Sequence, residues 1–446
     1  MTSLSSDENN STETNRAIRD SVIRKASLRL IPFMGLLYFV AFLDRVNIGF
    51  AALSMNEDLG FSATVYGMGA GIFFIGYFLF EVPSNILLEK VGARRWIARI
   101  MITWGVISAA MAFVNGPYTF YTLRFLLGLA EAGFFPGMIL YLTYWFPAAY
   151  RARIVGAFLI AIPLSSVIGA PISTMLLGYQ GFGLRGWQWL FIMEGVPSLL
   201  LGFVVLFFLT DKPEKANWLT REEKNWLGGV LAEEQKVREN EHKLGLVQAL
   251  LNARVWLFSL IYFGILIGLY GLGLWLPQII KGFGALSNIQ IGLLTVIPYF
   301  FAAIAMYLWG LHSDLTNERV WHVALPAFLG AAGLAASAFF ASPTLALMAL
   351  TVSAIGIYSS LPAFWTLPTA MLSGTAAAGG IALINSVGNL GGYLGPSLVG
   401  YLKDKTQNYA YGLLMLAVFI AISGALTVLM GQRQKLKLSS TSTEAG

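Results

Sequence analysis

The feature that most constrains the fold is an apolar stretch, residues 28–54, that carries charged residues inside it. A helix of about 20 mostly apolar residues, rising about 1.5 Å per residue, is long enough to cross a bilayer. Asp44, Arg45 and Asn47 lie well inside this stretch. Ionisable side chains at such depth are costly unless they face a partner or a water-filled cavity. The stretch therefore predicts a membrane-spanning helix that carries part of a functional site.

The whole chain has the composition of a polytopic membrane protein. It has 446 residues, of which 57% are hydrophobic and 12% are charged, whereas soluble proteins have about 25% charged residues. Hydropathy predicts twelve spans. They lie near 28–54, 62–88, 95–114, 118–145, 153–177, 187–209, 255–279, 289–311, 321–341, 344–367, 377–402 and 409–430.

A polar segment in the middle of the chain divides these spans into two bundles, 28–209 and 254–430, and a polar tail flanks them at each end. The first 27 residues form a polar tail, which we expect to be disordered at its start. Residues 210–253 mix both charge signs and predict a linker with surface helices, too short for a catalytic domain. Residues 431–446 form a C-terminal tail.

The distribution of basic residues predicts the orientation. With the N-terminus inside, 23 of the 29 Lys and Arg residues fall in inner segments, four in outer loops and two within the membrane. Inner loops carry this excess in membrane proteins, so both termini and the linker are expected in the cytoplasm. The net charge of +6 thus reflects topology and does not suggest nucleic acid binding.

An internal repeat relates the two halves. Each half has a short inner loop after its second span, in which an acidic residue precedes a basic residue by five positions. The pairs are Glu89 with Arg94 and Asp314 with Arg319. Two parallel six-span halves with a substrate site at their interface, near mid-membrane, are a transporter architecture.

All the ionisable groups that we place within spans lie in the first half, and none is expected to be buried in the second. This asymmetry predicts that charge coupling belongs to the first half. The groups are Asp44, Arg45, Glu81, Arg124, Glu131 and Glu194.

Arg124 and Glu131 are seven residues apart, so they share one helical face about 10 Å apart. Gly128 between them allows a neighbouring helix to pack closely. A carboxyl group near mid-membrane can exchange between neutral and charged forms, as proton coupling requires, and Glu131 is the candidate. The alternative is a structural ion pair or an interhelical hydrogen bond.

Arg45 is the candidate anchor for a substrate anion, because a guanidinium stays charged and binds a carboxylate through two parallel hydrogen bonds. It shares a helical face with Tyr38, and Arg124 offers a second basic contact. The alternative for Arg45 is a gate ion pair that never touches substrate. Glu81 and Glu194 are expected to be structural, with Glu81 pairing to basic residues of the inner loop.

Seven segments carry a resemblance to a known family: FLDRVNIGFA (42–51), EVPSNILLEKVGARRW (81–96), RFLLGLAEAGFFPG (124–137), GWQWLFIMEGVP (186–197), YGLGLWLPQIIK (270–281), SDLTNER (313–319) and INSVGNLGGYLGP (384–396). By these segments the chain resembles a major facilitator superfamily transporter, and within that superfamily the anion:cation symporter family, from about residue 28 to 430. Its inner-loop motif departs from the usual one, with Asn85 in place of Gly and Glu89–Lys90 in place of Asp–Arg.

The resemblance implies further roles. Asp44 aligns with a second proton site, although it could instead be a permanent counter-ion for Arg124 or Arg45. Trp365 and Asn385 fall where relatives hold the organic part of the anion, and Tyr77 is a similar candidate. Sugar-acid carriers use a glutamine in the fifth span, which the segment 161–169 lacks, so a tartrate-type or aromatic carboxylate is favoured.

We therefore predict an all-α, twelve-span transporter of the inner membrane that takes up a small organic anion with protons by rocking of its halves. We expect a monomer in the lipid bilayer, with no cofactor and no metal, since none of the three histidines has metal-site spacing. Rival interpretations are a sodium-coupled or uncoupled facilitator and a membrane anion sensor. An intramembrane enzyme is disfavoured because no paired nucleophile and base is found.

Overall fold

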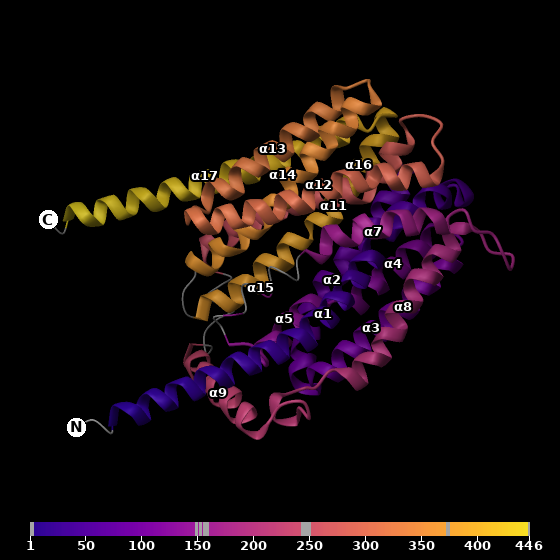
Figure 1. Ribbon diagram of the computed structural model, residues 1–446. Helices are drawn as coiled ribbons and strands as arrows, with labels where there is room; N and C mark the ends of the chain where they lie inside the picture. Colours follow the sequence, from indigo (N-terminus) through magenta and orange to yellow (C-terminus); the bar gives the residue numbers. More distant parts are fainter. Residues whose placement is uncertain are drawn as a thin grey trace.

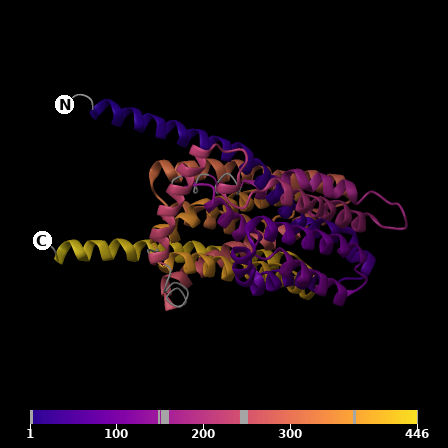
Figure 2. The same ribbon diagram turned by 90° about the horizontal axis from the view of Figure 1, so that it is seen from below.

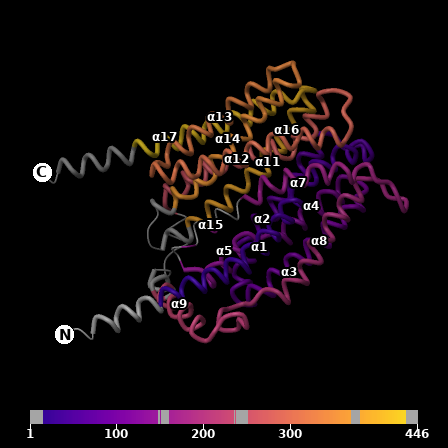
Figure 3. Tube along the Cα trace, viewed as in Figure 1, coloured from indigo at the N-terminus to yellow at the C-terminus, as the bar shows by residue number. Residues whose placement is uncertain are grey.

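A computed structural model describes residues 4–147, 150, 154, 160–241, 251–371 and 375–444, whose path is traced in Figure 3. Within these ranges, ten helices are long and apolar enough to cross a membrane, and one apolar helix is shorter. The helices of the first half are α1 (Leu4–Leu59), α2 (Ala63–Val91), α3 (Ala93–Ala110), the 3-10 turn η1 (Met111–Phe113), α4 (Pro117–Glu131), α5 (Phe134–Thr143), α7 (Ala161–Leu176) and α8 (Gly186–Phe208).

The linker and the second half follow the same all-α pattern, which confirms the predicted fold class. Their elements are η2 (Pro213–Lys215), α9 (Arg221–Glu241), α11 (Ala253–Lys281), α12 (Asn288–Thr316), α13 (Val320–Phe339), α14 (Pro343–Met371), α15 (Thr375–Asn389), α16 (Gly391–Thr406) and α17 (Ala410–Glu444).

The two halves form two bundles that lie side by side (Figure 1). Helix pairs that join them include α2 with α16 and α15, α7 with α12, and α1 with α11. Both ends of the chain leave the bundles on the same side, as Figures 1 and 2 show from two directions. Which side faces the cytoplasm stays a prediction.

The start of the N-terminal tail is helical, so our expectation of disorder there was wrong. The helix α1 begins at Leu4 and continues into the first span. Near the membrane it is held by the linker, since Ser21 and Lys25 donate hydrogen bonds to the Glu223 carboxylate at 2.7 and 2.8 Å. Burial raises the pKa of Glu223, but the bonds from Lys25, Thr220 and Ser21 outweigh it and lower the pKa overall.

Two spans that we predicted as continuous are interrupted. The fourth span breaks after Glu131, because Gly133 adopts a left-handed conformation (φ 84°) that separates α4 from α5. A residue with a side chain is disfavoured in this conformation. The eleventh span breaks at Leu390, between α15 and α16. The first break places Glu131 at the last turn of a helix, inside the bundle.

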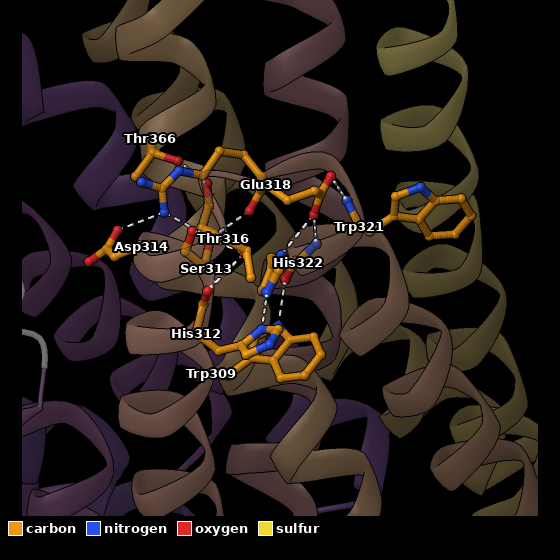
Figure 4. Close-up of polar contacts among 11 residues, drawn as sticks. Trp309, His312, Ser313, Asp314, Thr316, Glu318, Trp321, His322 and Thr366 are labelled. Carbon is orange, nitrogen blue, oxygen red and sulfur yellow. Dashed lines mark hydrogen bonds and ion pairs between the residues drawn. The ribbon is translucent and has the colours of Figure 1, made fainter.

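The inner loops of the two halves pair differently, despite their similar sequences. In the second half Arg319 binds Asp314, with Nη1 2.7 Å from Oδ1 (Figure 4). In the first half the backbone N–H of Arg94 donates to Asp211, which follows α8, at 2.9 Å. The repeat therefore conserves the residue pattern but not the partner.

A buried ionisable side chain also occurs in the second half, contrary to our expectation. His322 lies at the first turn of α13, is 5% exposed and contacts Glu318 and His312 at 2.7 and 2.8 Å (Figure 4). Burial raises the pKa of Glu318, but hydrogen bonds from Trp321 and His322 outweigh it and lower the pKa overall. The carboxylate lowers the cost of burying the imidazole at this helix end.

Gly128 should be needed for the close approach of α4 to α2. A Cβ atom at Gly128 would collide with the backbone of Phe73 and Tyr77, which cannot move aside cheaply. We predict that Gly128→Ala lowers stability by about 1–3 kcal/mol, measured as the unfolding midpoint in detergent. The control is Gly35→Ala, where a Cβ meets nothing within 4 Å. Equal stability of the two variants would contradict this packing argument.

Candidate functional site

A cavity lies between the two bundles, near the middle of the spans. Five of the predicted site residues line it, namely Arg45, Tyr38, Tyr77, Trp365 and Asn385. Its other lining residues are Phe42, Phe135, Ile162, Tyr262, Leu266, Leu269, Tyr270, Met306, Leu361 and Asn389. The wall is therefore mostly apolar and aromatic, with one fixed positive charge.

Arg45 connects the two bundles across this cavity. Its Nη2 forms an ion pair with the Glu131 carboxylate of α4, and its Nη1 donates to the Tyr270 hydroxyl of α11 at 3.1 Å. The Arg45 Nε is buried and has no hydrogen-bond partner among the described residues. The guanidinium thus retains one unused donor, and bidentate carboxylate binding would also need Nη2, which Glu131 occupies.

The environment of Arg45 is aromatic. The guanidinium carbon lies 5.3 Å from the ring centroid of Phe42, 5.5 Å from that of Phe73 and 5.4 Å from that of Tyr77. Ring faces attract a cation without neutralising it. Arg45 therefore stays available to an anion, provided that Glu131 gives up its place.

Glu131 is 1% exposed and does not itself line the cavity. It reaches the cavity only through its contact with Arg45. Glu131 does form an ion pair, as the alternative interpretation of the sequence held. Its partner is Arg45, and not Arg124, seven residues away on the same helix. Proton coupling by Glu131 stays a prediction.

Asp44 points away from the cavity into the first bundle. Its carboxylate accepts hydrogen bonds from Trp104 at 2.7 Å, Ser108 at 3.0 Å and Ser198 at 2.5 Å. None of its hydrogen-bond partners among the described residues is an arginine, so the alternative of a permanent counter-ion for Arg45 or Arg124 is not supported. Its role as a second proton site stays a prediction.

Arg124 also lies behind the cavity wall. It is 1% exposed, and its guanidinium donates to the backbone carbonyls of Gly69 at 3.3 Å and Ala70 at 3.0 Å. Both carbonyls belong to α2, so the side chain ties α4 to α2 in the present conformation. The predicted contact of Arg124 with substrate would require a rearrangement of these bonds.

Glu81 was expected to pair with basic residues of the inner loop, and that expectation was wrong. Its carboxylate accepts hydrogen bonds from Asn385 at 2.5 Å and Ser386 at 2.8 Å, both on α15 of the second bundle. Because Asn385 lines the cavity, Glu81 fixes one cavity residue in place. Glu194 lies inside the first bundle, 2% exposed, and accepts from Ser173 at 2.6 Å, as expected of a structural residue.

The aromatic part of the wall was only partly visible in the sequence. Trp365 packs edge to face on Tyr262 with 4.9 Å between ring centroids, and Tyr38 packs on Phe135 at 5.4 Å. Phe42, Phe135 and Met306 gave no distinguishing signal, because apolar residues are common in every span. Only their helix partners in space reveal them as lining residues.

On the side opposite the termini, polar contacts join the two bundles. Asp404 of α16 accepts the backbone N–H groups of Ala63 at 3.0 Å and Thr64 at 2.7 Å, at the start of α2. Burial raises the pKa of Asp404, but the bonds from Thr64 and Ala63 outweigh it and lower the pKa overall. Lys281 of α11 also donates to the backbone carbonyl of Leu53 at 2.6 Å.

These features define a multi-pass membrane transporter with a site between two helical bundles. Residues 34–396 match the model of the Major Facilitator Superfamily, and the chain belongs to this family. It is 57% identical over 412 residues to a "Putative tartrate transporter" of Agrobacterium vitis, covering 92% of this chain and 91% of the relative.

Other relatives agree on the family and differ in their names. The chain is 46% identical over 410 residues to a "Quinolone resistance transporter" of Acinetobacter baumannii, covering 92% of this chain and 94% of that protein. Among solved structures, a bacterial homologue of the human lysosomal transporter Spinster, inward-facing and unoccupied, matches with a TM-score of 0.72 at 18% identity. That match covers 92% of this chain and 96% of the solved chain, and it shows the fold alone. The relatives are transporters, not enzymes.

Removing the Asp404 carboxylate should loosen the contact between α16 and the start of α2. Because the chain has no cysteine, spin labels can be placed cleanly at Glu57→Cys and Lys405→Cys. We predict that Asp404→Ala shifts the interspin distances to longer values, since α2 loses its cap across the interface. Acidification through the lowered pKa of Asp404 should act in the same direction, because the protonated carboxyl accepts more weakly.

The control for this experiment is Asp314→Ala, which removes a carboxylate from the last turns of α12, at the other end of the second bundle. Its distance distribution should match that of the unmodified chain. A distribution that stays unchanged in Asp404→Ala would show that this contact does not hold the bundles together.

Proposed function

We propose that this protein is a proton-coupled symporter that takes up a small organic anion by alternating access. The observation that carries the proposal is the arrangement around Arg45, whose guanidinium meets a carboxylate of one bundle and a hydroxyl of the other. A cation at a bundle interface in an apolar wall suits an anionic substrate. The adjacent carboxylate suits a proton as the coupled ion.

The coupling follows from competition for one cation. When Glu131 is ionised, it occupies Arg45. When Glu131 takes up a proton, its hold on the guanidinium weakens, and the Nη2 and Nε groups can together donate two hydrogen bonds to a substrate carboxylate. Protonation of Glu131 therefore favours binding of the anion, and binding of the anion favours protonation of Glu131. Release on the opposite side follows when Glu131 loses its proton and Arg45 returns to it.

The rest of the cavity supports a compact or aromatic carboxylate. Ring surfaces come from Tyr38, Tyr77 and Trp365, and the two tyrosines also carry hydroxyl groups. Asn385 offers an amide for an oxygen of the substrate. Ile162 stands in the wall contributed by α7, where a sugar-acid carrier would need a polar side chain. The name of the Agrobacterium vitis relative is compatible with a dicarboxylate such as tartrate.

Asp44 and Arg124 act at a distance from the anion in this proposal. Asp44, held by four hydrogen-bond donors in the first bundle, of which the longest contact is that of Asn47 at 3.4 Å, is the second proton site. Arg124 becomes a second basic contact only if its bonds to α2 are exchanged during the cycle. The protein works as a monomer in the inner membrane, with both termini in the cytoplasm.

Sodium-coupled and uncoupled transport are the alternatives within this family. Among the described residues, Arg45 is the charged side chain that lines the cavity, and the two carboxylates behind the wall are each occupied, Glu131 by Arg45 and Glu81 by Asn385. This arrangement suits a proton better than a sodium ion, since sodium needs several free oxygen ligands. Uptake into liposomes driven by a pH gradient without sodium separates the alternatives. A sensor that binds anion without moving it would show no uptake under any gradient.

Glu131→Gln should uncouple the cycle. A glutamine cannot carry a proton and leaves Arg45 without its ionised partner, so anion binding persists while the pH gradient loses its effect. We predict loss of gradient-driven uptake with retention of counterflow exchange, both measured in liposomes. Glu89→Gln, at an exposed position in the last turn of α2, is the control and should transport normally. Gradient-driven uptake at the normal rate in Glu131→Gln would refute this assignment.

Arg45→Lys should lose substrate affinity, although it keeps the charge. An ammonium group lacks the planar fork, and losing one charged hydrogen bond of about 1.5–3 kcal/mol raises the Kd roughly 10- to 100-fold. Binding of tartrate and of an aromatic acid can be measured by calorimetry. Arg254→Lys, at an exposed position, should keep the original Kd. An unchanged Kd in Arg45→Lys would remove the anchor from the proposal.

A further inference from the structure

A second cavity lies far from the central one, where α1 enters the bundle from the side of the termini. It is open to the outside and lies between α1, the end of α8 and the segment before α9. Its polar residues are Lys25 and Arg29, and its rings are Phe33, Phe208 and Trp218. We call it the α1 groove. The transport proposal assigns it no role.

Arg29 is held in the α1 groove by rings. Its guanidinium carbon lies 4.7 Å from the centroid of Phe208 and 5.6 Å from that of Trp218. These rings are themselves fixed, since Phe208 packs on Phe33 at 4.3 Å and Trp218 stacks on Trp145 at 5.1 Å. The cation is thus pre-positioned by apolar surfaces.

No acidic side chain among the described residues forms a salt bridge with Arg29. Its Nε is buried and has no hydrogen-bond partner in the same part of the chain. Lys25, the other basic residue, is already neutralised by Glu223, whose two oxygens lie 2.8 and 3.0 Å from Nζ. The groove therefore carries one uncompensated positive charge and at least one unused donor.

The position of the α1 groove defines what can fill it. The first predicted span begins at residue 28, and Leu28 is 71% exposed beside Arg29. One turn further into the span, Pro32 and Phe33 continue the same wall. From the predicted start of the span at residue 28 and the exposure of Leu28, we infer that the groove meets lipid and that its charged end lies at the level of the head groups. Basic pockets beside spans favour anionic head groups.

We propose that the α1 groove binds an anionic phospholipid of the leaflet on the side of the termini. The phosphodiester, with a single negative charge, matches the single spare charge of Arg29. An acyl chain follows Leu28, Pro32 and Phe33. Because the groove includes both α1 and Trp218 of the linker segment, a bound lipid also holds the linker against the first bundle. This inference does not depend on which substrate is transported.

The test measures lipid binding to the purified full-length chain by native mass spectrometry. Dioleoyl phosphatidylglycerol is titrated against dioleoyl phosphatidylcholine, which has the same chains but no net charge. We expect preferential retention of one phosphatidylglycerol and a rise in the unfolding midpoint with that lipid. Arg29→Gln should weaken its binding about tenfold, as expected for a lost charged hydrogen bond.

Arg24→Gln is the matched control, since it removes the same charge from an exposed site on the same helix and lies outside the groove. It should bind phosphatidylglycerol as the unmodified chain does. If Arg29→Gln fails to fold, Arg29→Lys replaces it. This variant should bind phosphatidylglycerol more weakly than the unmodified chain does, but it should still bind phosphatidylglycerol more tightly than phosphatidylcholine.

Three results would overturn the proposal. The first is equal retention of the two lipids by the unmodified chain, and the second is equal loss of phosphatidylglycerol in Arg24→Gln and Arg29→Gln. The third is an equal rise in the unfolding midpoint with glycerol 3-phosphate alone and with the lipid, which would indicate a site for a soluble phosphate compound. Transport assays are not needed for any of these outcomes.

Discussion

The central constraint on this structure is that the charged guanidinium of Arg45 lies in an apolar interior. Arg45 cannot lose its proton in practice, so its charge must be compensated within the bundle. Glu131 supplies the compensation from α4, and Tyr270 adds a hydroxyl from the opposite bundle. In the function we propose, a substrate anion replaces the first of these partners at Arg45. The proposal thereby links the ionisation of Glu131 to the occupancy of the cavity.

The remaining cross-bundle contacts show how that local exchange could reach the whole molecule. On the side away from the termini, Asp404 caps α2 and Lys281 holds α1. Nearer the middle, Glu81 binds Asn385, which itself lines the cavity. These are short polar contacts between two bundles, so the proposed rocking would need to break only these hydrogen bonds and not the packing within each bundle. Alternating access of this kind needs two arrangements of nearly equal free energy.

Much of the fold was predictable, because spans of twenty apolar residues leave few options in a bilayer. The site was less so. Helical spacing correctly grouped Arg45 with Tyr38, but it could not show that Asp44, one residue earlier, turns into the first bundle. Nor could it show the break after Glu131, which depends on the left-handed conformation of Gly133, or the choice of Arg45 over Arg124 as its partner. These features depend on contacts between helices that are distant in sequence.

The exchange of partners at Arg45 is the central claim, and proton uptake on binding tests it most directly. Calorimetric titration of the purified protein with its anion, repeated in buffers of different ionisation enthalpy, gives the number of protons taken up per anion bound. By linkage, competition between Glu131 and the anion requires this number to be positive and the affinity to fall as pH rises. An uptake near one proton per anion, lost in Glu131→Gln, is the predicted result. Binding without any proton uptake across the pH range would contradict the account.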